Sequence, residues 1–192
     1  MKRSYAVLEG IYEKDPATNA FILAITTEKY ADIFNELDPA PFKRRDINHD
    51  LRVYLEDSSS DIPLTHKVIL QFNLSNETAD HQKEHLITSG LRTYFFFVEN
   101  QLIREIHKSY QRGAIYVAIA FLLLLVSFTL NRVSSPDIVF TTLVEGVNIG
   151  GWVFLWEAIS TFAFKKRDVR NRKKHYERFT AAPIRFNYTV SA

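Results

Sequence analysis

The longest apolar stretch of the chain runs from Gly113 to Leu130 and contains no charged residue. A helix needs about 20 predominantly apolar residues to cross the hydrocarbon core of a bilayer. A second stretch, Ile138 to Phe164, lacks lysine and arginine, and the short connection between the two contains Pro136. The pattern therefore predicts two transmembrane helices, 113–130 and 138–164, joined by a tight turn into an antiparallel hairpin.

Basic residues flank the two predicted spans unevenly. Arg104, Lys108 and Arg112 precede the first span and a basic run from Lys165 to Arg178 follows the second, whereas the connection has only Arg132. Because loops rich in lysine and arginine stay in the cytoplasm, both termini are predicted to be cytoplasmic. The basic run either only sets this topology or also contacts anionic lipid headgroups. Its candidate lipid contacts are Lys165, Lys166, Arg167, Lys173 and Lys174.

Outside the spans, short apolar or alternating segments predict β-strands. Phe21–Ile25 is a short apolar run, and Asp50–Glu56, Val68–Leu74 and Ile184–Val190 alternate between apolar and polar residues. Alternation with a period of two places the apolar side chains on one face of a strand. These segments are therefore predicted to form a sheet that is buried on one side.

Two helices are predicted to complete the cytoplasmic part. Thr27 is the expected cap of a short helix over 28–37, and Ser75 or Asn76 that of a long one. No proline interrupts the chain from Glu77 to Leu130, so the long helix is expected to continue into the first span. Its apolar residues recur at spacings of three and four: Ile87, Leu91, Tyr94, Val98, Leu102, Ile106 and Tyr110.

Without the hairpin, the predicted order is strand, helix, strand, strand, helix, strand. This is the βαββαβ order of a ferredoxin-like α+β sandwich. We therefore expect a cytoplasmic domain over 1–112, a membrane hairpin over 113–164, and a basic helix and strand over 165–192 that return to the cytoplasmic domain. The alternative is that the tail pairs with another subunit or has no partner.

The segment Glu145–Phe186 resembles a family of uncharacterised bacterial inner-membrane proteins. In that family, a second span with a Glu-Gly…Gly-Trp-Val…Trp pattern is followed by a basic helix and a Pro-Ile or Pro-Val strand. Gly90–Phe95 is similar to the family's arginine–aromatic segment. The resemblance implies a two-helix topology in a bacterial inner membrane, and no activity. The sequence departs from the family at Ala158-Ile159 and Ala163–Lys166, where the family tends to have a proline and further aromatic residues.

The second predicted span carries polar residues that are rare inside a membrane. Glu145 lies about 12 Å into the bilayer, close to Asn148 and to the small-residue pair Gly146 and Gly150. Small residues let two helices approach closely, and a Glu or Asn side chain can form a hydrogen bond across that contact. We expect an oligomer interface here, or alternatively a polar path for ions or protons. The candidate residues are Glu145, Gly146, Asn148, Gly150, Gly151 and Glu157.

Three further groups of side chains are weaker candidates for a site. Glu157 is expected within reach of Arg112, near the cytoplasmic boundary. The loop residues Lys43, Arg44 and Arg45 are candidates for contact with a phosphate or a lipid headgroup. His81 and His85 have a spacing that suits a metal ion, but no third ligand is evident, so a solvated surface is expected and no metal.

Composition excludes several classes of protein. The 24 lysines and arginines against 22 acidic residues leave a net charge of +2, which does not indicate a nucleic-acid-binding protein. The absence of cysteine excludes disulfides, iron–sulfur clusters and thiol catalysis. The chain has neither a phosphate-binding glycine-rich loop nor a nucleophile motif. Neither an enzyme nor a cofactor is therefore expected.

Two functions of different classes fit these observations. The first is a membrane-anchored, oligomerising cytoplasmic module of the bacterial inner membrane that interacts with a partner or senses a ligand. The alternative is a small oligomeric ion channel or membrane-permeabilising effector gated by the cytoplasmic domain. The expected partners are the lipid bilayer, further copies of the chain, and a cytoplasmic protein or small ligand.

Overall fold

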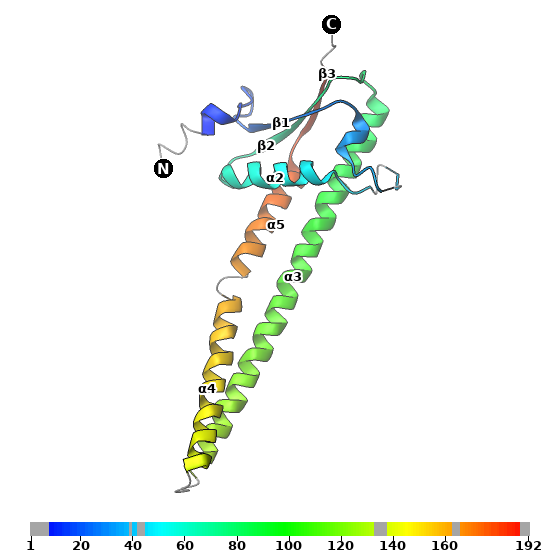
Figure 1. Ribbon diagram of the computed structural model, residues 1–192. Helices are drawn as coiled ribbons and strands as arrows, with labels where there is room; N and C mark the ends of the chain where they lie inside the picture. The colour runs from blue at the N-terminus through cyan, green and yellow to red at the C-terminus, as the bar shows by residue number, and fades with distance from the viewer. Residues whose placement is uncertain (1–7, 39, 42–44, 133–137, 163–165, 189–192) are drawn as a thin grey trace. The chain divides into compact units, whose positions relative to one another are not determined.

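The computed structural model describes residues 8–38, 40–41, 45–132, 138–162 and 166–188 (Figure 1). Two compact units share the chain. The first, called the α/β unit below, comprises Met1–Asn100 and Lys173–Ala192; the second, the hairpin unit, comprises Gln101–Arg172. The described elements are, in chain order, β1 (Phe21–Thr27), the 3-10 helix η1 (Tyr30–Ile33), α2 (His49–Asp61), β2 (Val68–Leu74), α3 (His81–Leu130), α4 (Ile138–Ser160), α5 (Lys166–Ala181) and β3 (Ile184–Tyr188).

The sheet of the α/β unit consists of three parallel strands in the order β1-β2-β3. Leu23 lies opposite Leu70, which in turn lies opposite Ile184. Parallel neighbours need a crossover connection, and the crossover between β2 and β3 contains α3, α4 and α5. The last strand therefore returns to the sheet after both long apolar helices.

One face of this sheet is buried. The other, called the open face below, is exposed along β1 and β3, although Ile69 of the central strand β2 is buried there too. Phe21, Leu23, Leu70, Phe72 and Leu74 are fully buried on the first face, as are the helical core residues Leu55, Leu91, Phe95 and Phe179. Figure 1 shows α2 and α5 on one side of the sheet. On the open face, β1 and β3 expose Ala24, Thr26, Arg185 and Asn187. Because side chains alternate along a strand, one set forms the core and the next faces solvent.

The strand predicted at Asp50–Glu56 is wrong, because this segment lies in helix α2. Leu51 and Leu55 are buried, whereas Val53, which alternation assigned to the same face, is 41% exposed. The Asn48 side chain accepts a hydrogen bond from the Asp50 amide at 2.8 Å and caps the helix. Two leucines four residues apart fit one helical face as well as one strand face.

The fold is mixed helix and strand, as expected, but the ferredoxin-like βαββαβ order is not confirmed. A helix stands where that order needs its second strand, and the three strands of the described sheet all run parallel. The observed order within the α/β unit is strand, 3-10 turn, helix, strand, helix, helix, strand.

Two predicted helix starts are also corrected. Segment 28–37 forms only the short η1, and the Thr27 hydroxyl donates to Asp32 Oδ2 at 3.1 Å instead of capping an α-helix. Helix α3 begins at His81, after the predicted caps Ser75 and Asn76. Asp80 caps it, since its Oδ1 accepts hydrogen bonds from the amides of Gln82 and Lys83.

Helix α3 continues without a break to Leu130, as the lack of proline predicted. Of its predicted apolar stripe, Ile87, Leu91 and Leu102 are buried. Phe95 is buried in place of its neighbour Tyr94, and Tyr110 at the far end is 42% exposed. Burial of the stripe is therefore greatest between Ile87 and Leu102 and falls toward Tyr110.

Helices α3 and α4 are long and apolar enough to cross a membrane. Within the hairpin unit they run antiparallel. The Ser127 hydroxyl donates to the Val144 carbonyl at 3.4 Å, and the rings of Tyr116 and Phe154 lie 6.0 Å apart. The predicted turn around Pro136 lies outside the described residues.

Candidate functional site: the groove beside the edge strand

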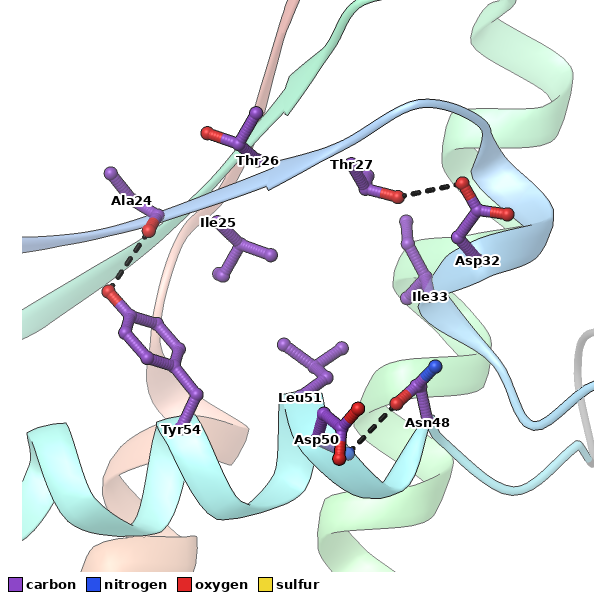
Figure 2. Close-up of a pocket in the computed structure, with 10 residues that line it drawn as sticks. All are labelled: Ala24, Ile25, Thr26, Thr27, Asp32, Ile33, Asn48, Asp50, Leu51 and Tyr54. Carbon is purple, nitrogen blue, oxygen red and sulfur yellow. Dashed lines mark hydrogen bonds between the residues drawn. The ribbon is translucent and has the colours of Figure 1, made fainter.

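A groove lies between the outer edge of β1 and the first turns of α2, with a volume of about 360 Å³ (Figure 2). Its floor is apolar, formed by Ile25, Ile33 and Leu51. The two ends differ: Tyr54 lies at one end, and Asp32 and Asp50 lie toward the other (Figure 2). The lining residues are Ala24, Ile25, Thr26, Thr27, Asp32, Ile33, Asn48, Asp50, Leu51 and Tyr54.

Strand β1 is an edge strand, and its hydrogen bonds show which groups point outward. The Phe21 amide donates to the Lys67 carbonyl at 3.0 Å, and the Thr27 carbonyl accepts from the Ser75 amide at 3.2 Å. Alternate residues of a parallel strand bond to the same neighbour. The odd-numbered residues of β1 therefore bond toward β2, and the backbone groups of Ile22, Ala24 and Thr26 point away from it.

In the part of the chain that the structure describes, the outer edge of β1 pairs with another backbone segment only at its start. Segment 13–15 pairs antiparallel with the beginning of β1, where the Ile22 amide donates to the Glu13 carbonyl at 2.8 Å. Further along, the Tyr54 hydroxyl donates to the Ala24 carbonyl at 3.0 Å. Among the described residues, the Ala24 amide and both backbone groups of Thr26 have no hydrogen-bond partner. An unpaired strand edge thus lines the groove.

The groove carries negative charge. Asp32 and Asp50 line it, and its ten lining residues include no lysine, arginine or histidine. Asp32 is held in place because its Oδ2 accepts hydrogen bonds from the Lys29 amide at 2.8 Å and from the Thr27 hydroxyl at 3.1 Å. A carboxylate has further acceptor sites. The groove therefore offers an apolar floor, a free strand edge and acceptors for a cation.

A second polar cluster, called the α5–α2 junction below, joins the returning chain to α2. The Arg178 guanidinium donates to the carbonyls of Ser59 at 2.6 Å, Ile62 at 3.0 Å and Pro63 at 3.2 Å. The last carbonyls of a helix have no partner within the helix, so Arg178 satisfies the end of α2. The Tyr176 hydroxyl donates to Glu56 Oε1 at 2.5 Å.

His175 belongs to the same junction. Its Nδ1 lies 2.7 Å from the Ser59 hydroxyl. Burial lowers the pKa of His175 below its ordinary value, and the neighbouring Arg178 charge lowers it further. The ring is therefore held in its neutral form. Sequence reasoning assigned this segment to a basic run and missed the junction, because charge alone does not tell a buried arginine from a solvated one.

Side chains near both ends of strand β3 form polar contacts that the sequence pattern did not predict. Near its start, Arg185 forms an ion pair with the buried Asp15 at 2.8 Å. At its end, the Tyr188 hydroxyl donates to Glu84 Oε1 and lies 2.5 Å from the Tyr30 hydroxyl. Burial, followed by the hydrogen bond to the Glu84 carboxylate, raises the pKa of Tyr188. These contacts join segments more than 100 residues apart.

The glycines predicted for a helix contact in α4 differ in their surroundings. A Cβ on Gly151 would lie 2.8 Å from the Leu124 side chain, so Gly151 allows close packing of α4 on α3. A Cβ on Gly150 would make an ordinary 3.7 Å contact with Leu123, and one on Gly146 would meet nothing within 4 Å. Glu145 is exposed and Asn148 half-buried. Of these three glycines of α4, only Gly151 must lack a side chain for the packing within one chain.

The expected pairing of Arg112 with Glu157 does not form. Both side chains are exposed, and no ion pair links them in the described part of the hairpin unit. In α3, His81 Nδ1 lies 3.1 Å from Glu84 Oε2. The described ranges contain no group of three side chains able to hold a metal ion.

The described members of the predicted lipid- or phosphate-contact residues have different surroundings. Lys173 pairs with Glu177 and, at 3.6 Å, with Glu99, so its charge is used within the α/β unit. Arg167 and Lys174 are exposed, and Arg45 donates to the Glu36 carbonyl at 3.3 Å. Lys43, Arg44, Lys165 and the side chain of Lys166 lie outside the described residues.

Comparison of the chain with protein-family models, curated proteins and solved structures finds no match. The resemblance to bacterial inner-membrane proteins therefore stays a prediction.

Proposed function

We propose that this chain is a membrane-anchored interaction module of the bacterial inner membrane, with a cytoplasmic α/β unit and an oligomerising hairpin. The observation that carries the proposal is the route of the chain. It leaves the α/β unit through α3, passes through two apolar helices, and returns through α5 to add β3 beside β2. The α/β unit, and any partner that it binds, is thereby connected to the hairpin through two chain segments, α3 and α5.

Exposed apolar side chains support the membrane anchor. Phe121 is 70% exposed on α3, and Trp152 and Trp156 are 60% and 71% exposed on α4. Soluble monomers rarely expose apolar patches on this scale, because the contact with water is unfavourable. A surrounding bilayer removes this cost, and the basic flanks of the hairpin favour cytoplasmic termini.

The exposed side of α4 supports oligomerisation. Glu145 is exposed there, and the space beside Gly146 is empty. A carboxylate facing lipid is costly, so such residues in membrane helices almost always face a partner helix or a water-filled cavity. We infer that a second copy covers this side of α4.

Topology reporters test the anchor. Fusions of a reporter that is active only in the cytoplasm should give a signal at Met1 and at Ala192 but none at Ser134, and the full chain should resist carbonate extraction from membranes. A silent fusion at Ala192, or release of the chain by carbonate, would contradict the proposal.

An oligomeric channel gated by the α/β unit is the second candidate, and the exposed Glu145 beside the half-buried Asn148 favours it. A pore needs several hairpins, since two helices cannot enclose water. Purified chain in liposomes distinguishes the two candidates. Ion flux that changes with Glu145→Gln while assembly stays intact supports the channel, whereas assembled chain without flux supports the interaction module.

A further inference from the structure

We propose that the edge of β1 binds an extended peptide segment of a partner protein, which adds a strand to the sheet and places a lysine or arginine near Asp32 and Asp50. This inference rests on the proposed interaction role and specifies the partner's chemistry. Addition of a strand to an exposed sheet edge gives affinity through backbone hydrogen bonds and specificity through the pockets for alternate side chains.

Where the groove lies, the Tyr54 hydroxyl occupies the Ala24 carbonyl, and the other outward backbone groups of Ala24 and Thr26 are open. The Ala24 amide and both backbone groups of Thr26 point outward without a partner among the described residues. Proteins usually protect such edges with charged residues, proline or bulges. Ala24, Ile25 and Thr26 provide none of these. An added strand would supply hydrogen bonds that the edge otherwise lacks.

The chain itself shows that this edge accepts an antiparallel bridge, and where its coverage by residues 8–15 stops. Lys14 forms an antiparallel bridge with Phe21, and the Ile22 amide bonds to the Glu13 carbonyl. Continued pairing would bring residues before Tyr12 alongside Ala24, but residues 8–11 are helical. The Tyr12 hydroxyl bonds instead to Asp61 at the end of α2. Residues 8–15 therefore do not supply a segment beside Ala24 and Thr26.

The walls of the groove define the side chains that fit. Alternate residues of an added strand face the groove, because strand side chains alternate between the two faces. One such residue would lie on the apolar floor formed by Ile25, Ile33 and Leu51, and the groove-facing residue two positions away would reach the acidic end. With Asp32 and Asp50 there and no basic side chain in the lining, a cationic residue fits best.

The experiment uses the full chain in detergent and a fluorescent eight-residue peptide that alternates valine and threonine and carries one central arginine. Fluorescence anisotropy should show saturable binding. Replacement of the arginine by glutamate should weaken binding about fivefold or more, because the acidic end then repels the peptide. A peptide of the same sequence with alternate backbone amides N-methylated should not bind.

A matched pair of variants tests the edge itself. The Thr26 amide points away from β2, so Thr26→Pro removes an outward donor and no ladder hydrogen bond, which an edge strand tolerates. It should weaken binding about three- to tenfold, the effect of one lost hydrogen bond, while Thr26→Val should bind normally. Asp50→Asn should reduce the preference for arginine over glutamate.

Several results would overturn the inference. Equal binding of the arginine and glutamate peptides, or of the N-methylated and unmodified peptides, would exclude an added strand with this charge preference. A change in oligomer size with Thr26→Pro, without effect on the peptide, would assign the edge to a second copy. If Thr26→Pro fails to fold, the N-methylated peptide still decides. The topology reporters and the carbonate extraction do not depend on this edge. Failure of the peptide to bind would therefore leave the proposed membrane anchor untouched.

Discussion

At the scale of single residues, Arg178 shows how one side chain joins distant parts of the chain. Its guanidinium donates to four carbonyls at and just after the end of α2, those of Ser59, Ile62, Pro63 and His66, more than 100 residues earlier in the sequence. Arg178→Met keeps the length of the side chain and removes its donors. We expect the α/β unit to lose about 2–4 kcal/mol of stability, since the carbonyls of a buried helix end are left unsatisfied.

The measurement for Arg178→Met is the thermal midpoint of protease resistance of the α/β unit in detergent. Lys174→Met is the matched control, because Lys174 is an exposed basic residue on the same helix. Its midpoint should stay within the error of the original chain. Equal behaviour of the two variants would show that the α5–α2 junction does not stabilise the unit.

His175 predicts the pH dependence of the same junction. Because its pKa in the folded state lies below the ordinary value of 6.5, the unfolded chain takes up a proton more readily. The stabilisation is fully present above pH 6.5 and is lost as the pH falls below it toward the folded-state pKa. The thermal midpoint should therefore fall between about pH 7 and pH 5. His175→Gln should flatten this decline, whereas the exposed control His85→Gln should not.

At the scale of elements, strand β3 connects the end of the chain to its beginning. Phe186 stacks on Phe72 with ring centroids 5.7 Å apart, and Arg185 pairs with Asp15. Deletion of 183–192 removes these contacts and the half-buried side chains of Ile184, Phe186 and Tyr188. It should destabilise the α/β unit by several kcal/mol in all, each side chain contributing less than the about 1.5–3 kcal/mol of a fully buried one. Limited proteolysis measures this loss. The substitution Asn187→Ala at an exposed position of β3 should leave resistance unchanged, and equal resistance of the truncated and the original chain would contradict a structural role for β3.

At the scale of the whole molecule, two glycines of α4 separate folding of one chain from assembly of several. A leucine at Gly151 would collide with Leu124, so Gly151→Leu should disrupt the hairpin itself. The space beside Gly146 is open within one chain, so Gly146→Leu should leave the hairpin intact and weaken assembly. Intrachain cross-linking between α3 and α4 measures the first effect, and size-exclusion chromatography with light scattering measures the second. Unchanged assembly of Gly146→Leu would place the oligomer contact elsewhere.

Local patterns in the sequence were enough to predict the two apolar helices, the continuous α3, and the strands β1, β2 and β3. Each of these depends on a property of neighbouring residues: an uncharged run, the absence of proline, or strict alternation. Residues 50–56 show where a local pattern fails. Leu51 and Leu55 fit a period of two and a helical turn equally well, and only the Asn48 cap and the core contacts of the folded chain favour the helix.

Only the tertiary structure decided which of the many basic and polar residues have structural partners. Arg178 and Lys174 are both basic residues of one helix, yet one caps α2 and the other is exposed. The free edge of β1 likewise depends on which strand lies beside it and where the preceding segment turns away. Contacts between residues far apart in the chain follow from the path of the backbone in space. No local periodicity encodes that path, because the free energy of such contacts is realised only when the distant segments meet.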